Sequence, residues 1–113
     1  MLTIEKLQAF GANTAEGLSR CFGNTDLYLR LVSMVIEEEN FSRLEQVAAS
    51  GDLQRAFEAA HALKGVLGNL SLTPLYEPIV EITELLRVKA DADYNARIRT
   101  LLQKRDALRD LCA

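Results

Sequence analysis

One short segment holds the residues best suited to chemistry. His61 is the only histidine of the chain, and Lys64, Gly65 and Gly68 follow it three, four and seven residues later. On a helix these offsets bring side chains to one side of the cylinder, so an ammonium would lie beside the imidazole with bare backbone ahead of it. Histidine changes charge near neutral pH, and its unprotonated ring nitrogen is a competent nucleophile. The segment therefore combines a reactive side chain with space for a second molecule.

The apolar pattern around His61 indicates which way it points. A stripe recurs at alternating steps of three and four residues and must be buried against other helices; it comprises Leu53, Ala56, Ala60, Leu63, Leu67 and Leu70. At 3.6 residues per turn, His61 projects roughly 130° from the centre of this stripe, Lys64 roughly 70° and Gly65 roughly 170°. We therefore expect His61 outside the core, either as a reactive group or as a solvated surface histidine.

Each neighbour of His61 has a functional and a structural interpretation. Lys64 could contact an anionic group bound beside the imidazole or could be an ordinary solvated lysine, and spacing alone does not separate the two. Glycine inside a helix costs about 1 kcal/mol relative to alanine. Gly65 could give another molecule access, or could be a helix-packing contact, which its outward direction disfavours. Gly68 is less decisive, because it also lies near the helix end. Asn69 is either a polar helix-end residue or part of a docking surface.

Composition narrows the classes of function. The chain has 113 residues, enough for one domain with a real core, and its 49% hydrophobic and 26% charged residues are ordinary globular values. The net charge of −3 disfavours nucleic-acid binding, because a phosphate backbone requires a basic patch. The apolar runs are too short to cross a bilayer and the N-terminus lacks the order of a signal peptide, so we expect a cytoplasmic protein that does not bind membranes. Cys21, buried, and Cys112, near the chain end, are expected as reduced thiols, and a single histidine leaves a zinc site short of ligands.

Helical periodicity dominates the chain, and strand signals are nearly absent. Two short helical pieces are expected over 3–10 and 14–22, followed by one long helix from Asn24 or Thr25 to Ser50, with Asn40 as the place where it could bend. The apolar face of this long helix would comprise Leu27, Leu31, Met34, Phe41, Leu44 and Ala48. Gly51 can end it with a left-handed residue, and Asp52 can cap the histidine helix that follows.

Two further helices complete the predicted fold. Thr73 as N-cap and Pro74 as first helical residue are a start signal, although Pro78 should kink that helix or delay its start. The last helix should begin near Asp91 or Asp93, with Arg105 in a gap of its apolar stripe. The inward residues of the two helices would be Leu75, Ile79, Ile82 and Leu86, then Tyr94, Ile98, Leu101, Leu108 and Leu111. Because short connections favour antiparallel packing, we predict an all-α fold: an antiparallel up-and-down four-helix bundle over 24–113 with a short helical extension over 1–23, in one domain.

The pattern His61-x-Leu63-Lys64-Gly65, followed by Gly68-Asn69-Leu70 and a helix opening at Thr73-Pro74-Leu75, resembles the histidine phosphotransfer (HPt) domain of multistep two-component phosphorelays. The resemblance covers the chain from about Asn24 to the C-terminus. It implies an intermediate phosphoryl carrier, in which His61 attacks the aspartyl phosphate of a receiver domain and later passes the phosphoryl group to the aspartate of another receiver. Lys64 would stabilise the phosphate and Gly65 would give the partner access, with Gly68, Asn69 and Thr83 in the docking surface.

Two positions depart from the family pattern. Ser71 stands where many relatives have glycine after the Asn-Leu pair, which makes a left-handed turn there slightly costlier. Thr83 stands on the facing helix where some relatives place a glutamine near the histidine. As a shorter and weaker donor, Thr83 puts a second hydrogen bond to the imidazole or phosphate in doubt. Neither change removes the phosphoacceptor.

The resemblance implies protein partners and no cofactor. The partners would be response-regulator receiver domains and a hybrid sensor histidine kinase, with Mg²⁺ supplied by the receiver and the protein itself a monomer. The sequence has no Gly-rich phosphate loop after a strand, so we expect no ATP-dependent kinase activity. The alternatives are a non-phosphorylated four-helix adaptor that binds a receiver or partner helix, and a phosphoacceptor domain of chemotaxis type or from a larger hybrid histidine kinase. Retention of His61, Lys64 and Gly65 together argues against the adaptor.

Overall fold

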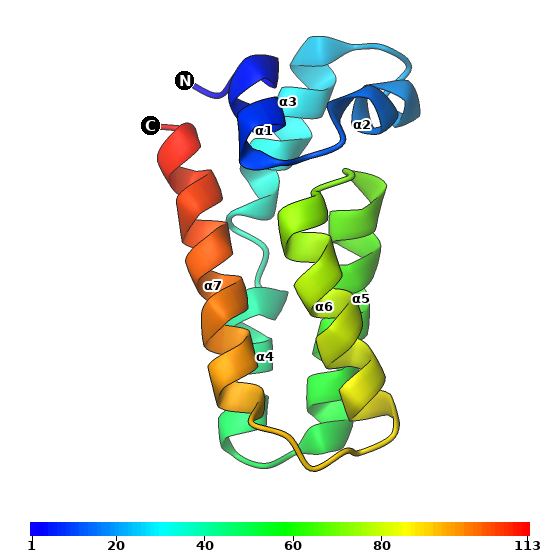
Figure 1. Ribbon diagram of the computed structural model, residues 1–113, viewed down its shortest axis with the longest axis vertical. Helices are drawn as coiled ribbons and strands as arrows, with labels where there is room; N and C mark the ends of the chain where they lie inside the picture. The colour runs from blue at the N-terminus through cyan, green and yellow to red at the C-terminus, as the bar shows by residue number, and fades with distance from the viewer.

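The computed structural model describes residues 1–113 and contains only helices (Figure 1), which confirms the all-α expectation. Their bounds are α1 Ile4–Phe10, α2 Thr14–Arg20, α3 Thr25–Val35, α4 Asn40–Ala49, α5 Leu53–Asn69, α6 Thr73–Arg87 and α7 Tyr94–Leu111. None of these helices has the length and apolar character needed to span a membrane.

Side chains cap the start of five of the seven helices. Each capping oxygen accepts a hydrogen bond from the backbone N–H three residues later, which satisfies one of the free donors of the first turn. The capping residues are Thr3, Asn13, Asn24, Asp52 and Asp93. The predicted starts at Asn24, Asp52 and Asp93 are therefore confirmed.

The start of α6 differs from the prediction by one residue. Leu72 is the N-cap, without a side-chain hydrogen bond, so Thr73 is the first helical residue instead of the cap. Pro78 lies inside α6 and does not delay its start. The first turn closes ahead of this proline, because Leu75 and Tyr76 both donate backbone hydrogen bonds to the Leu72 carbonyl, at 2.9 and 2.8 Å.

The expectation of one long helix over 24–50 is wrong, because this segment forms two helices. α3 ends at Val35 and α4 begins at Asn40, where the Glu38 carboxylate accepts hydrogen bonds from the backbone and side chain of Asn40 at 3.4 and 2.8 Å. In a continuous helix Phe41 would point roughly 180° away from Val32, yet both side chains are fully buried. The break lets both enter the core.

Two hydrophobic side chains predicted to be helical or inward lie at the surface. Phe22 is 93% exposed and has a positive φ of 57°, so α2 ends two residues earlier than expected. Met34 is 62% exposed, and α3 buries Tyr28, Val32 and Val35 in place of the predicted face. Because α3 stops before Phe41, its inward direction is set by its own contacts and does not follow the periodicity of α4.

Four helices enclose most of the core. α5 contacts α4 and α6, and α7 contacts α6 and α4, so α4 to α7 form a closed ring in which sequence neighbours run in opposite directions (Figure 1). The predicted stripe of α5 faces inward, with Ala56, Ala60, Leu63 and Leu67 fully buried. At the top of the view in Figure 1, α1 and α2 lie next to the connection between α5 and α6. That connection follows the segment of α5 that carries His61.

The apolar stripe of α7 has the gap that the sequence predicts. Arg105 fills it with a side chain that is only 17% exposed, and its guanidinium carbon lies 5.4 Å from the centroid of the Phe41 ring. The methylene stem is therefore covered while the charged end stacks on an aromatic face. Cys21 is buried, as expected, and Cys112 is half-buried; both are free cysteines.

Gly17 should be required by the contact of α2 with α3. A Cβ atom there would lie 2.5 Å from ring atoms of Tyr28, which is fully buried and cannot move aside cheaply. We expect Gly17→Ala to lower the free energy of unfolding by about 1 to 3 kcal/mol, as overpacking does. Urea denaturation followed by circular dichroism measures this change.

Gly65→Ala is the matched control, because a Cβ atom at Gly65 meets nothing within 4 Å. Alanine there should raise the free energy of unfolding by about 1 kcal/mol, the helix-propensity difference. Equal stability of the two variants would show that α2 shifts away from Tyr28 at no cost.

Candidate functional site

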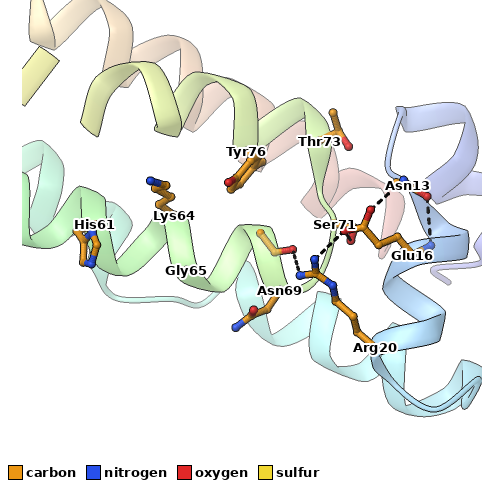
Figure 2. Close-up of a pocket in the computed structure, with 11 residues that line it drawn as sticks. Asn13, Glu16, Arg20, His61, Lys64, Gly65, Asn69, Ser71, Thr73 and Tyr76 are labelled. Atoms are coloured by element: carbon orange, nitrogen blue, oxygen red, sulfur yellow. Dashed lines mark hydrogen bonds and ion pairs between the residues drawn. The ribbon is translucent and has the colours of Figure 1, made fainter. Parts of the chain in front are cut away.

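The predicted site residues of α5 line one open cavity of about 450 Å³ (Figure 2). The cavity lies along α5 and reaches from His61 to the connection with α6. The residues that line it are Asn13, Glu16, Arg20, His61, Lys64, Gly65, Gly68, Asn69, Ser71, Thr73 and Tyr76. The structure thus brings His61, Lys64, Gly65, Gly68 and Asn69 together, and it adds residues of α2 and α6 that the sequence did not indicate.

His61 is exposed on the rim of α5, outside the core, as its direction from the stripe predicts. Its ring stacks against Phe57 one turn earlier, with centroids 5.8 Å apart and planes inclined by 22°. No hydrogen bond joins the imidazole to the other residues of the cavity (Figure 2). The ring nitrogens are therefore accessible to a molecule that approaches from solvent.

Lys64 is half-buried one turn beyond His61. Its side chain lies on the side of α5 that faces α6 (Figure 2), and it takes part in none of the ion pairs of the chain. An unpaired ammonium on a flexible four-carbon stem can turn toward an anion that enters the cavity. The geometry therefore supplies a free positive charge within one helical turn of the imidazole.

The two glycines beside the histidine have different physical reasons. Gly65 is exposed, and a Cβ atom there would meet nothing within 4 Å, so no packing contact within the chain requires glycine. A Cβ atom at Gly68 would lie 2.8 Å from the ring of Tyr76 on α6. Gly68 therefore allows α5 and α6 to approach closely, whereas Gly65 leaves an area of bare backbone open to solvent.

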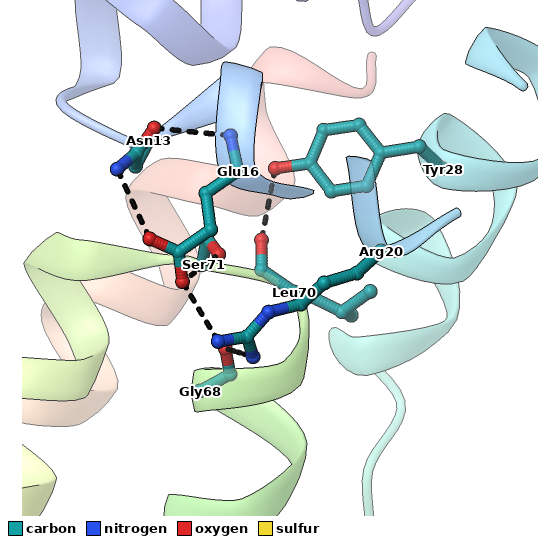
Figure 3. A network of polar contacts seen from close by, with 7 residues as sticks. All are labelled: Asn13, Glu16, Arg20, Tyr28, Gly68, Leu70 and Ser71. Atoms are coloured by element: carbon teal, nitrogen blue, oxygen red, sulfur yellow. Dashed lines mark hydrogen bonds and ion pairs between the residues drawn. The ribbon is translucent and has the colours of Figure 1, made fainter. Parts of the chain in front are cut away.

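The C-terminal end of α5 is held by residues of α2 and α3 (Figure 3). Arg20 donates to the Gly68 carbonyl at 2.8 Å, and the buried hydroxyl of Tyr28 donates to the Leu70 carbonyl at 2.9 Å. The last carbonyls of a helix lack partners within it, and a cation near them is favourable. Burial, with a smaller contribution from Cys21, raises the pKa of Tyr28 above its ordinary value of 10.0, which keeps the hydroxyl protonated as a donor.

Ser71 adopts the left-handed conformation that its position requires, with a φ of 54°. Its carbonyl accepts from the backbone N–H of Asn13 at 3.0 Å, and its hydroxyl donates to Glu16 at 3.1 Å. Glu16 in turn pairs with Arg20 at 2.8 Å (Figure 3). These contacts offset the cost of a left-handed serine and fix the turn that follows the histidine helix.

Thr83 does not belong to the site. It is fully buried on α6, where its hydroxyl donates to the Ile79 carbonyl of the same helix at 2.6 Å. Its single donor is therefore already used, and it cannot take the place of a glutamine that reaches the imidazole or phosphate. The residues of α6 that line the cavity are Thr73 and Tyr76.

Sequence reasoning missed Asn13, Glu16, Arg20 and Tyr76 as residues of the cavity, and it considered Ser71 and Thr73 only for the turn and the helix start. One local signal was present: Asn13 accepts from the backbone N–H of Glu16 at 3.2 Å, and the spacing of an N-cap and an acidic residue three positions later is readable as a helix start. The contact of Arg20 with Gly68 joins residues far apart in the sequence. No periodic pattern encodes such a contact.

Comparison with known proteins identifies the family. A family model described as the Hpt domain matches residues 31–112, which include His61, Lys64 and Gly65 and leave α1 and α2 outside the match. No curated protein and no solved structure matches the chain. The chain therefore belongs to the Hpt domain family, which serves phosphotransfer in two-component signalling.

Proposed function

We propose that the protein is a phosphorelay intermediate with His61 as its phosphoacceptor. It accepts a phosphoryl group from the aspartate of one receiver domain and passes it to the aspartate of another. The observation that carries this proposal is the exposed imidazole of the only histidine, which has no hydrogen-bond partner in the cavity, beside an area of bare backbone at Gly65. In this proposal α4 to α7 are the antiparallel four-helix bundle that presents the imidazole at its rim.

The proposed chemistry needs no group other than the imidazole to form a covalent bond. A ring nitrogen of the neutral imidazole donates its lone pair to phosphorus, an N–P bond forms, and the P–O bond to the receiver aspartate breaks. The aspartate leaves as a carboxylate with the electron pair, and the proton on the other ring nitrogen stays in place. Transfer to the second receiver reverses these steps. Such transfer depends on in-line positioning and on charge stabilisation, which Lys64 would supply from this chain and Mg²⁺ from the receiver.

The shape of the site fits a folded domain as the phosphoryl donor. The cavity is open along α5 and contains mostly polar side chains, so a loop of a partner protein can enter it from solvent. The partners in this proposal are receiver domains of response regulators and a hybrid sensor histidine kinase, which places the relay in the cytoplasm. Asn69, exposed at the end of α5, would lie in the docking surface.

Labelling tests the phosphoacceptor directly. A receiver domain charged with radioactive phosphate, together with Mg²⁺, should label the protein, and the label should be labile in acid and stable in base, as an N–P bond requires. His61→Gln should abolish labelling and leave the helical circular dichroism spectrum unchanged, because the side chain is outside the core. Label retained in the variant, or resistant to acid, contradicts the assignment. Receiver binding without label would favour the adaptor.

The charge of Lys64 should matter more during transfer than during docking. Lys64→Ala should slow transfer about tenfold, the loss expected when one hydrogen bond to a charged group is removed, with receiver affinity changed much less. Single-turnover transfer at several receiver concentrations separates the two. Lys104→Ala is the control, since Lys104 is also half-buried but lies on α7. Equal effects of the two variants would leave Lys64 as an ordinary surface lysine.

Gly65 should respond in opposite directions in stability and in function. Gly65→Gln fills the open backbone that the receiver loop must reach, and in-line transfer needs the reacting atoms within about 3.5 Å, so the transfer rate should fall at least tenfold. The fold should tolerate the change, because a Cβ atom meets nothing within 4 Å. Thermal melting and transfer are measured on Gly65→Gln and Gly65→Ala together. Unimpaired transfer in Gly65→Gln refutes the access role, and a large drop in melting temperature would show a packing role instead.

A further inference from the structure

A line of stacked side chains leads from α6 to the histidine. The Arg87 guanidinium carbon lies 5.3 Å from the centroid of the Phe57 ring, and the Phe57 ring stacks on His61 with centroids 5.8 Å apart. Glu84 pairs with Arg87 at 3.3 Å and so restrains it on α6. The stack is therefore anchored on two helices and ends at the exposed imidazole.

The two rings of this stack differ in their freedom to move. Phe57 is half-buried and packs against the hydrophobic core, which restricts the motion of its ring. His61 is exposed and, without a neighbour, would sample several rotamers. Offset stacking of two aromatic rings is a favourable contact. The Arg87 guanidinium over the Phe57 ring adds a cation–π contact that helps to hold the phenyl ring. Phe57 therefore limits the orientations that the imidazole can adopt.

The direction of the contact suits a nucleophile. The lone pair of an unprotonated ring nitrogen lies in the plane of the imidazole, whereas the stack occupies a face of the ring. The contact can thus fix the ring without covering the nitrogen that reacts. A group held in its reactive orientation before the encounter gives up less freedom on reaching the transition state.

We infer that Phe57, held by Arg87, is a positioning residue that orients the His61 imidazole for phosphoryl transfer. This inference rests on the proposed function, because it assigns Phe57 a role in the same reaction. Phe57 touches the imidazole and not the phosphoryl group, so it acts only through His61. An aliphatic side chain would also cover the core at this half-buried position, so what the aromatic ring adds is its contacts with Arg87 and His61.

Proton NMR tests the stack independently of phosphotransfer. Because His61 is the only histidine, its two carbon-bound ring protons are the only imidazole signals of the chain. In the unmodified protein these protons should be shifted upfield of those of free histidine, because the phenyl ring current acts on them. The comparison is made at the acidic and the basic end of the titration, so that both imidazoles are in the same protonation state. Phe57→Leu should move them toward the values of free histidine, and Phe57→Tyr should keep them shifted. Unshifted signals in the unmodified protein would overturn the inference without any variant.

Transfer kinetics test the role. Phe57→Leu keeps an apolar side chain but removes the ring, and should lower kcat for transfer from a phosphorylated receiver about two- to tenfold, the range of one aromatic pair, with KM within about twofold. Phe57→Tyr keeps an aromatic ring and should leave kcat close to that of the unmodified protein. Phe10→Leu is the control, because Phe10 is also half-buried against the core but lies on α1.

The outcomes separate this inference from the function on which it rests. Unchanged kcat in Phe57→Leu, or an equal loss in Phe57→Leu and Phe57→Tyr, overturns the positioning role. If Phe57→Leu unfolds, Arg87→Gln provides the second test. This variant should lower kcat and also reduce the upfield shift of the His61 ring protons. Transfer that is absent even from the unmodified protein refutes the phosphorelay function itself, while the NMR shifts would still report whether the stack exists.

Discussion

The rotation of α5 about its own axis is the constraint on which the site depends. Burial of Ala56, Ala60, Leu63 and Leu67 against α4 and α6 fixes this rotation, because turning the helix would expose one apolar edge and bury a polar one. With the rotation fixed, the His61 side chain must lie at the exposed rim of the helix. The core therefore does more than stabilise the helix, because it also directs the His61 side chain toward solvent.

A second constraint acts along the axis of α5, and it comes from outside the part of the chain that matches the family model. α2 supplies Arg20 to the Gly68 carbonyl and Glu16 to the Ser71 hydroxyl, and α3 supplies the hydroxyl of Tyr28 to Leu70. Surface ion pairs such as the one between Glu16 and Arg20 contribute little by themselves. The carbonyls at the end of a helix, however, need partners. The N-terminal helices thus complete the end of the histidine helix and also form one wall of the cavity beside it.

The sequence was a good guide where structure is local and a poor one where it is not. The stripe of α5, the caps at Asn24, Asp52 and Asp93 and the outward direction of His61 follow from spacing within one helix, and all are present. The break between α3 and α4 does not, because each half has an apolar face and only the packing of both reveals that the faces do not align. The burial of Thr83 has the same origin, because neighbouring helices decide whether its side chain is covered. The contacts of Arg20 and Tyr76 with α5 are equally invisible to any periodic pattern.

The distribution of unfavourable backbone choices separates what the fold needs from what it tolerates. Gly68 and the left-handed Ser71 are each explained by a contact, with the Tyr76 ring in one case and with Asn13 and Glu16 in the other. Gly65 has no such contact, although glycine in the middle of a helix costs about 1 kcal/mol relative to alanine. A cost that no packing contact within the chain offsets requires a reason outside it. The open backbone at Gly65 lies one turn from the exposed imidazole of His61, which stacks on Phe57 and has no hydrogen-bond partner in the cavity. An open glycine at this place is what the proposed access role of Gly65 requires.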